Sequence, residues 1–234
     1  MTTYVLVHGA WSGAHGFRLV RRRLAAAGHE VFTPSLTGLG ERSHLVSPEI
    51  GLGTHVHDLV NHVWYEDLHD IVLVGFSYGG MVISGALAHI ADRVRHLVYL
   101  DAIVPGDGDS VSSLLGWPVT ESFGPQASWL VTSVPRTFDD PDEGAFMVPR
   151  RDPHPARCFV EPVRLARPLE SYPFSRLYIR ATADAPDAPG RDAFERFARH
   201  AQESPAWTYR GIATNHMIAS NRPDELTAVL LELA

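Results

Sequence analysis

Short apolar runs alternate along the chain with longer segments in which apolar residues recur at helical spacing. The runs predict buried strands at residues 4–7, 31–33, 71–75, 94–101, 176–182 and 206–209. Helical patterns separate them at residues 17–27, 52–68, 81–88 and 190–200, and a last helix is expected at 223–233. Strands that alternate with helices in this way are typical of a mainly parallel sheet covered on both faces. The pattern therefore predicts an α/β fold.

The alternation is lost between residues 107 and 173, a segment rich in Pro, Gly, Ser and Asp. A structureless connection of this length is improbable inside a compact domain, so we expect an inserted lid with short helices. Residues 1–106 and 174–234 would then form one core domain. The aromatic residues of the lid are expected to roof an apolar pocket; they are Trp117, Phe123, Trp129, Phe138, Phe146 and Phe159.

The sequence Gly75-Phe76-Ser77-Tyr78-Gly79 joins the predicted strand at 71–75 to the predicted helix at 81–88. The G-x-S-x-G spacing is that of a nucleophile elbow, a strained turn that presents a serine hydroxyl at the sheet edge. Gly75 and Gly79 supply the two positions where a side chain would not fit. We therefore predict Ser77 as a nucleophile, with the Tyr78 N–H as an oxyanion donor. The alternative is a glycine-rich strand-to-helix turn with an incidental serine, which the flanking pattern disfavours.

A serine hydroxyl needs a base to take its proton and an acid to hold that base. In the order that accompanies an elbow serine, an acid follows a late strand and a histidine follows the last strand. Asp184 and His216 occupy these places and are predicted to complete a catalytic triad. Two other acids stay open at this stage: Asp187, which lies further from the strand end, and Asp101, which ends the strand after the elbow.

The loop after the first strand is expected to supply the second oxyanion donor. Gly9 has no side chain where backbone would meet substrate, so the Ala10 N–H is the candidate donor. His8 is expected to order this loop. Substrate contacts are predicted for Gly9, Trp11, Trp129 and Met217.

Charge and composition exclude several functions. The chain has 27 acidic and 20 basic residues, a formal charge of −7, and no basic block beyond residues 21–23, so nucleic acid is not an expected partner. All basic residues are arginine, which rules out Schiff-base, pyridoxal and Walker-type lysine chemistry. The single Cys158 cannot close an intrachain disulfide, and no leader or membrane span is evident. A cytoplasmic protein without a membrane partner is therefore expected.

A histidine cluster at residues 55–62 raises the question of a metal. The H-x-H-x-D-H pattern of metallo-β-lactamase-like enzymes needs a residue between the second histidine and the aspartate, and His57-Asp58 has none. On a helix, His55 and His57 would also point to different faces, so a polar helix face is the preferred interpretation. Cys158 is interpreted as a small apolar filler. No metal or cofactor is expected.

Three segments carry a resemblance to a known family: LVHGAW at 6–11, GFSYGGM at 75–81 and NHM at 215–217. They resemble the α/β-hydrolase superfamily, in particular the branch of plant methyl-ester esterases, hydroxynitrile lyases and small bacterial relatives. The likeness covers residues 4–106 and 176–233 and is weak across the lid. The lyases of that branch carry Thr at the position of Gly9 and Lys at the position of Met217, so the resemblance implies an esterase. Phe76 and Tyr78 replace the usual His and the common Leu beside the serine, which alters the pocket.

The sequence thus predicts a serine hydrolase that cleaves a small or medium, partly apolar carboxylic ester or lactone through an acyl-enzyme on Ser77, without a cofactor. The fold is also compatible with a homodimer. Two alternatives remain: a tailoring enzyme that uses the same triad to open or close a lactone or to demethylate a polyketide ester, and a ligand receptor without turnover. An aspartate-nucleophile dehalogenase or epoxide hydrolase is disfavoured because Ser77 occupies the elbow.

Overall fold

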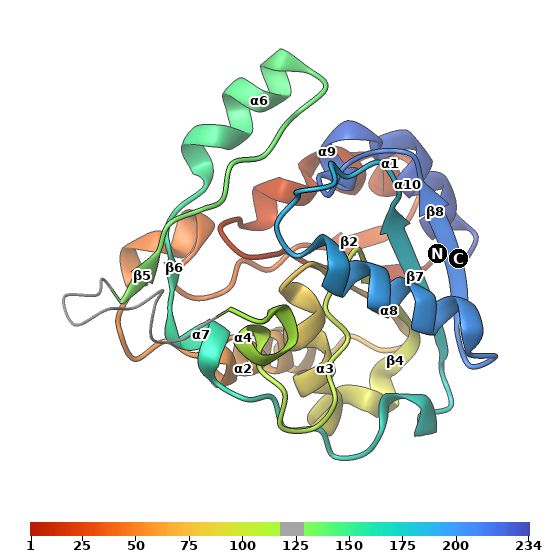
Figure 1. Ribbon diagram of the computed structural model, residues 1–234. Coiled ribbons are helices and arrows are strands. Elements are labelled where there is room, and N and C mark those ends of the chain that lie inside the picture. The colour runs from red at the N-terminus through yellow and green to blue at the C-terminus, as the bar shows by residue number, and fades with distance from the viewer. Residues whose placement is uncertain (118–128) are drawn as a thin grey trace.

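A computed structural model describes residues 1–117 and 129–234. Six parallel strands form one sheet in the order β2-β1-β3-β4-β7-β8 (Figure 1). Their bounds are β1 (Thr3–Val7), β2 (Glu30–Phe32), β3 (Ile71–Phe76), β4 (Val94–Leu100), β7 (Ser175–Ala181) and β8 (Thr208–Ile212). The predicted α/β fold with a parallel sheet is confirmed. The last strand lies two to three residues later than predicted, because Trp207 instead packs against Tyr99 and donates its indole N–H to Glu170.

Helices cover both faces of the sheet. One face carries α1 (Arg18–Ala26), α9 (Ile218–Asn221) and α10 (Pro223–Leu231), and the other carries α2 (Leu52–Tyr65), α3 (Gly79–Ile90) and α8 (Arg191–Glu203). Short 3-10 helices occur at η1 (Ala14–Phe17), η2 (Gly40–Leu45), η3 (Ala91–Arg93), η4 (Val148–Arg150) and η5 (Leu169–Ser171). The predicted helices are thus found, with ends that differ from the prediction by up to three residues.

Two apolar cores follow from the alternation of side chains along each strand. In β1, Val5 and Val7 pack into the core shared with α2, α3 and α8, whereas Tyr4 and Leu6 pack into the core shared with α1, α9 and α10. All four side chains are fully buried. A strand buried on both faces explains why the chain shows continuous apolar runs instead of alternating ones.

Short elements follow β4 and precede β7, in the region predicted as a lid. They are α4 (Val111–Leu115), β5 (Leu130–Val131), α6 (Pro141–Met147), β6 (His154–Pro155) and α7 (Arg157–Val160), and β5 pairs antiparallel with β6. Helix α6 stands out from the core in Figure 1, and Glu143 on it forms an ion pair with Arg18 of α1. Phe123 lies outside the described residues. The division into core and lid stays a prediction.

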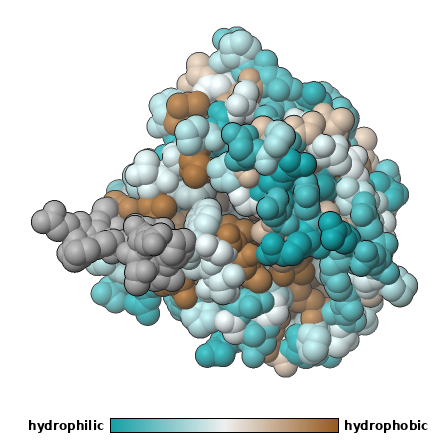
Figure 2. All heavy atoms as spheres, viewed as in Figure 1, coloured by the Kyte–Doolittle hydropathy of each residue, from teal (hydrophilic) through white to brown (hydrophobic). Residues whose placement is uncertain are grey.

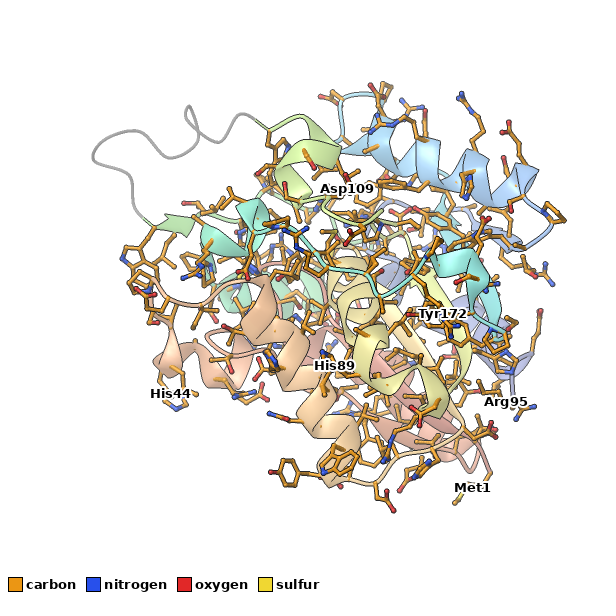
Figure 3. The ribbon with its side chains drawn as sticks, turned by 90° about the horizontal axis from the view of Figure 1, so that it is seen from below. Met1, His44, His89, Arg95, Asp109 and Tyr172 are labelled. Atoms are coloured by element: carbon orange, nitrogen blue, oxygen red, sulfur yellow. The ribbon has the colours of Figure 1, made fainter. Side chains whose placement is uncertain are left out.

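The carboxyl ends of the strands meet at one edge of the sheet. Figure 3 places Met1 and Arg95, which lie next to the amino ends of β1 and β4, on the opposite side of the molecule from Asp109, which follows β4. In open parallel sheets this edge is where ligands bind. Among residues 1–117 and 129–234, no helix combines the length and apolar character that crossing a bilayer requires.

Candidate active site

Ser77 lies in the turn between β3 and α3, at the carboxyl edge of the sheet. Its φ is 54°, a left-handed conformation that costs energy for any residue with a side chain. The turn is packed too tightly for side chains at the flanking glycines: a Cβ on Gly75 would lie 2.7 Å from the Gly79 carbonyl oxygen, and one on Gly79 would lie 2.6 Å from that of Val7. The geometry is that of a nucleophile elbow.

His216 lies on the loop after β8, the strand at one end of the sheet order, and its side chain reaches Ser77. Its Nε2 lies 3.0 Å from the Ser77 Oγ. The imidazole is held between the rings of Phe76 and Phe194, with centroid distances of 4.8 and 5.0 Å, and the residue is only 4 % exposed. The structure thus brings together the serine and the histidine that the sequence predicts.

The carboxylate that holds this imidazole belongs to Asp101. Its Oδ2 accepts a hydrogen bond from the Nδ1 of His216 at 2.6 Å, and its Oδ1 accepts from the guanidinium of Arg180 at 2.6 Å and from the N–H of Ala181 at 3.1 Å. Asp101 is fully buried and follows β4 with a φ of 41°. The prediction that Asp184 holds the imidazole is therefore wrong, and the alternative at Asp101 takes its place.

Asp184 instead orders the loop that carries the histidine. Its Oδ1 accepts from the backbone N–H of His216 at 2.8 Å, and its Oδ2 accepts from Arg180 at 3.1 Å. β4 and β7 are neighbours in the sheet, so acids that follow either strand arrive at the same place. Asp187, the other alternative, borders only hollows at the surface and makes no hydrogen bond to His216.

The charges of these groups suit a base at His216. Burial alone would raise the pKa of Asp101, but the bonds from His216 and Arg180 outweigh it and hold that pKa below its usual range. Burial lowers the pKa of His216, and Asp101 offsets this only in part. At neutral pH the imidazole is therefore uncharged, with its proton on Nδ1 toward Asp101 and its Nε2 lone pair toward the Ser77 hydroxyl.

Two backbone N–H groups belong to residues that border the same cavity as Ser77. They are those of Ala10 and Tyr78, and neither N–H donates to another described residue. The Tyr78 N–H also lies at the start of α3, where the helix dipole favours negative charge. Gly9 allows this approach, since a Cβ there would lie 2.9 Å from the Cβ of Ser77.

Aromatic side chains form much of the wall of this catalytic cavity. Trp11 packs against Trp117 and Phe159, and all three line it. Figure 2 shows apolar atoms gathered near the middle of the face in view. Of the other predicted contacts, Trp129 is 39 % exposed and does not line the cavity, and Met217 lines a neighbouring one with Ala10 and Phe76.

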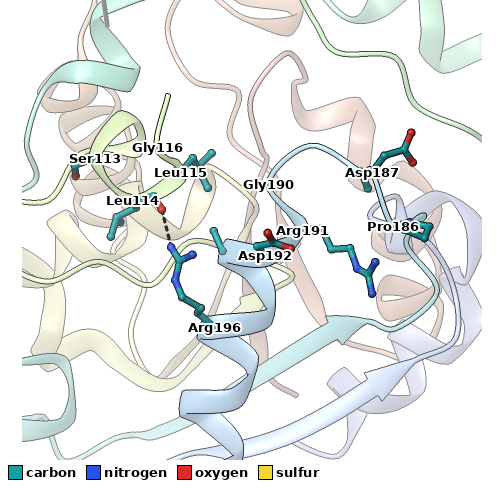
Figure 4. A pocket seen from close by; sticks show the side chains of 12 residues that line it. Ser113, Leu114, Leu115, Gly116, Pro186, Asp187, Gly190, Arg191, Asp192 and Arg196 are labelled. Atoms are coloured by element: carbon teal, nitrogen blue, oxygen red, sulfur yellow. Dashed lines mark hydrogen bonds between the residues drawn. The ribbon is translucent and has the colours of Figure 1, made fainter. Parts of the chain in front are cut away.

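A larger hollow of about 910 Å³ lies between α4 and the start of α8 (Figure 4). Arg196 crosses it to donate to the Leu114 carbonyl at 2.8 Å. Neither Ser77 nor His216 lines this hollow, although Leu115 borders both it and the catalytic cavity. It is therefore a surface recess beside the site.

A buried cluster of His55, His154 and Cys158 lies behind Tyr78, with potential ligand atoms within 4.8 Å of one another. The interpretation of His55 as part of a polar helix face is wrong, because its side chain is fully buried. Its Nε2 must donate to the Thr37 carbonyl at 3.0 Å, so its Nδ1 accepts from the Tyr78 hydroxyl at 2.9 Å. Sequence reasoning missed this cluster because two of its members come from the segment between β4 and β7, far from His55 in sequence.

These hydrogen bonds decide whether the cluster fits a metal. The Nδ1 of His154 accepts from the N–H of Trp11 at 3.3 Å, which leaves a proton on its Nε2. Burial raises the pKa of the Cys158 thiol to about 12, so without a metal the thiol is protonated at neutral pH. Both imidazole lone pairs thus face protein donors, and the buried Nε2 of His154 has no hydrogen-bond partner among the described residues. Cys158 is fully buried in this cluster, and its Sγ lies 3.7 Å from the Nδ1 of His55 and from the Ile50 carbonyl oxygen.

An elbow serine after β3, with its base and acid on loops after later strands, defines the class of α/β hydrolases. Comparison with family models agrees: residues 4–229 match the alpha/beta hydrolase family, and the chain belongs to it. The predicted resemblance is confirmed at this level.

The relatives that match the chain include esterases. A carbendazim hydrolyzing esterase from Nocardioides sp. (strain SG-4G) is 50% identical over 115 residues, 49% of this chain and 48% of the relative. A putative chloroplastic methylesterase 14 from Arabidopsis thaliana is 26% identical over 99% of this chain and 71% of its own length. The match thus spans about half the length of the first of these relatives. Among solved structures, the Arabidopsis methylesterase MES16 superposes with a TM-score of 0.77 at 24% identity, covering 99% of this chain and 98% of that one.

Proposed function

We propose that the protein is a carboxylic ester hydrolase that works through an acyl-enzyme on Ser77. The observation that carries this proposal is the 3.0 Å contact between the Ser77 Oγ and the Nε2 of an imidazole that is itself bonded to a buried carboxylate. A serine hydroxyl in this arrangement can lose its proton as it attacks a carbonyl.

The reaction follows from the positions of the groups. His216 takes the proton as the Ser77 Oγ bonds to the ester carbon, and Asp101 stabilises the imidazolium that forms. The N–H groups of Ala10 and Tyr78 are the proposed donors to the oxyanion. His216 then returns the proton to the departing alcohol as the C–O bond breaks. Water, activated by the same imidazole, cleaves the acyl-enzyme and restores the serine.

The proposed substrate is a small or medium ester with an apolar part. The walls of the catalytic cavity include the aromatic side chains of Trp11, Trp117 and Phe159, which suit an apolar part of the substrate. The names of the relatives, a carbendazim hydrolyzing esterase and a putative methylesterase, support ester hydrolysis, with methyl esters as the first class to test.

A labelling and turnover experiment tests the proposal. We expect wild type to hydrolyse p-nitrophenyl acetate and to be labelled by a fluorophosphonate at Ser77, located by peptide mapping. Ser77→Ala should lose both properties, while Ser171→Ala, at an exposed serine, keeps them. Labelling at another residue, or equal rates for wild type and Ser77→Ala, would refute the mechanism. Methyl esters and lactones in the same panel distinguish an esterase from a lactone-processing enzyme, and ligand binding without any turnover would identify a receptor.

The location and assembly of the protein belong to the same proposal. A lone buried cysteine fits a reducing compartment, so we propose a cytoplasmic protein. A homodimer is proposed on the precedent of the fold. Light scattering on the eluting chromatographic peak would report twice the 25.8 kDa mass of the chain for a dimer, and the chain mass itself would refute it.

A further inference from the structure

Two arginines of the region between β4 and β7 approach the catalytic centre without an acidic partner. Arg136 lines the catalytic cavity with Ser77 and both oxyanion donors, and Arg151 lines the neighbouring cavity, which also borders Ala10. Both residues are half-buried. Arg151 donates to the Val134 carbonyl at 3.0 Å, and Arg136 has no hydrogen bond or ion pair with any described residue.

This is an unusual state for a guanidinium that is partly removed from water, because such a charge normally has an anionic or polar partner. Other shielded arginines here follow the rule: Arg180 pairs with two carboxylates, and Arg18 pairs with Glu143. Burial lowers the pKa of both cations, and repulsion from Arg136 adds to the effect at Arg151, whose pKa falls to about 10. An arriving anion would relieve this repulsion.

The nearby carboxylates do not form an ion pair with Arg136. Asp101 and Asp184 attract Arg136, but neither lies within 4.0 Å of it, and both already bind Arg180 and His216. Arg136 also lines a surface hollow of about 760 Å³ that contains Asp184 and His216. It therefore stands between the catalytic cavity and the solvent, where a substrate would enter.

We propose that Arg136, assisted by Arg151, binds a second, ionised carboxylate on the substrate, so that the preferred ester is a half-ester of a dicarboxylic acid. The ester group lies at Ser77, the hydrocarbon chain lies against the aromatic wall, and the free carboxylate lies at the guanidinium of Arg136. A guanidinium binds a carboxylate through paired N–H donors, which gives both charge and orientation. This inference rests on the proposed function and specifies its substrate.

Matched substrates test the inference. The measurement is kcat/KM for the monomethyl and dimethyl esters of glutaric, adipic and suberic acid, which differ at one end only. We expect wild type to prefer at least one monomethyl ester over its dimethyl partner, and Arg136→Gln to lower that preference by about 10- to 100-fold, the range for a hydrogen bond to a charged group. Arg136→Lys should restore part of it. Arg164→Gln, at an exposed arginine without a hydrogen bond or ion pair to any residue that the structure describes, is the matched control.

A binding measurement keeps the test independent of turnover. Titration calorimetry with free glutarate, adipate and suberate should show that one of them binds wild type, and that Arg136→Gln weakens it by a similar factor. A dimethyl ester hydrolysed as fast as each monomethyl ester, with an unchanged ratio in Arg136→Gln, would overturn the carboxylate site while leaving the esterase proposal intact. No binding of any dicarboxylate would also overturn it. Absent turnover and labelling together with dicarboxylate binding would support the site and refute the esterase.

Discussion

Asp101→Asn changes one hydrogen bond at the catalytic centre while keeping the size of the side chain. The carboxylate accepts bonds from His216, Arg180 and the Ala181 N–H. An amide has only one oxygen. We expect this oxygen to accept from the Arg180 guanidinium and the Ala181 N–H, because both groups can only donate. The NH₂ group then faces the Nδ1 of His216, which must become an acceptor. The imidazole proton moves to Nε2, facing the Ser77 Oγ, and the base is lost.

The expected size of the effect follows from this tautomer. A triad histidine held in the wrong tautomer loses about 10⁴ in kcat, or about 5 kcal/mol at 1.36 kcal/mol per tenfold. The fold should survive, because Arg180 keeps Asp184 as an ionic partner. Loss of a charged hydrogen bond costs about 1.5–3 kcal/mol of stability, and each kcal/mol lowers Tm by about 2–4 °C in a chain of this size.

Asp184→Asn is the matched control, since it makes the same chemical change one strand away. Its amide oxygen can still accept from the backbone N–H of His216, so the imidazole keeps its tautomer. We expect a loss of about tenfold or less in kcat/KM, the value of one weakened hydrogen bond. The assay is steady-state hydrolysis of p-nitrophenyl acetate, with thermal unfolding of each variant in parallel. A folded Asp184→Asn protein that loses as much activity as Asp101→Asn would refute this assignment of the acid.

Four further outcomes follow from the structure. Burial lowers the pKa of His216, and the neutral imidazole is the active form. The acid limb of the pH profile of kcat/KM for a neutral ester should therefore have its midpoint below about pH 6.5. A midpoint above about pH 7 would contradict this. Arg136→Gln removes a cation that lowers that pKa, so its acid limb should move to higher pH; an unmoved limb would place the guanidinium too far away to act. Gly79→Ala should lower the free energy of unfolding by about 1–3 kcal/mol in urea titrations, because its Cβ would lie 2.6 Å from a backbone oxygen; unchanged stability would contradict the tight elbow. The Cys158 thiol is buried and has a pKa of about 12, so it should react with iodoacetamide only after unfolding. EDTA should leave esterase activity unchanged, and a loss of activity with EDTA would reopen the question of a metal.

The parts of the site that sequence could predict are encoded locally. The spacing of Gly75 and Gly79 around Ser77 reflects contacts within one turn and with the adjacent strand, so the elbow can be identified without a structure. The place of His216 follows from the order of strands and helices. The apolar runs also predicted the strands, because a strand that is buried on both faces has few polar residues to interrupt its apolar run.

The acid could not be predicted because the choice depends on sheet order. β4 and β7 are separated by some 75 residues of sequence but pair with each other, so Asp101 and Asp184 end beside the same guanidinium. Sequence order alone gives no reason to prefer either. The cluster of His55, His154 and Cys158 was missed for a similar reason: its members meet only when the segment between β4 and β7 packs against α2.

The arrangement of charge explains how one imidazole can be neutral at rest and still accept a proton. Asp101 and Asp184 share the single cation of Arg180 on one side of His216, which leaves an excess negative charge there. On the cavity side lie Arg136 and the N–H groups of Ala10 and Tyr78. In the proposed reaction, a proton that moves from Ser77 to His216 travels toward the negative side, and the oxyanion develops toward the positive side. Arg136 opposes the first shift by lowering the pKa of His216 and favours the second, whereas Asp101 and Asp184 favour the first. These fixed charges need no rearrangement during the proposed reaction.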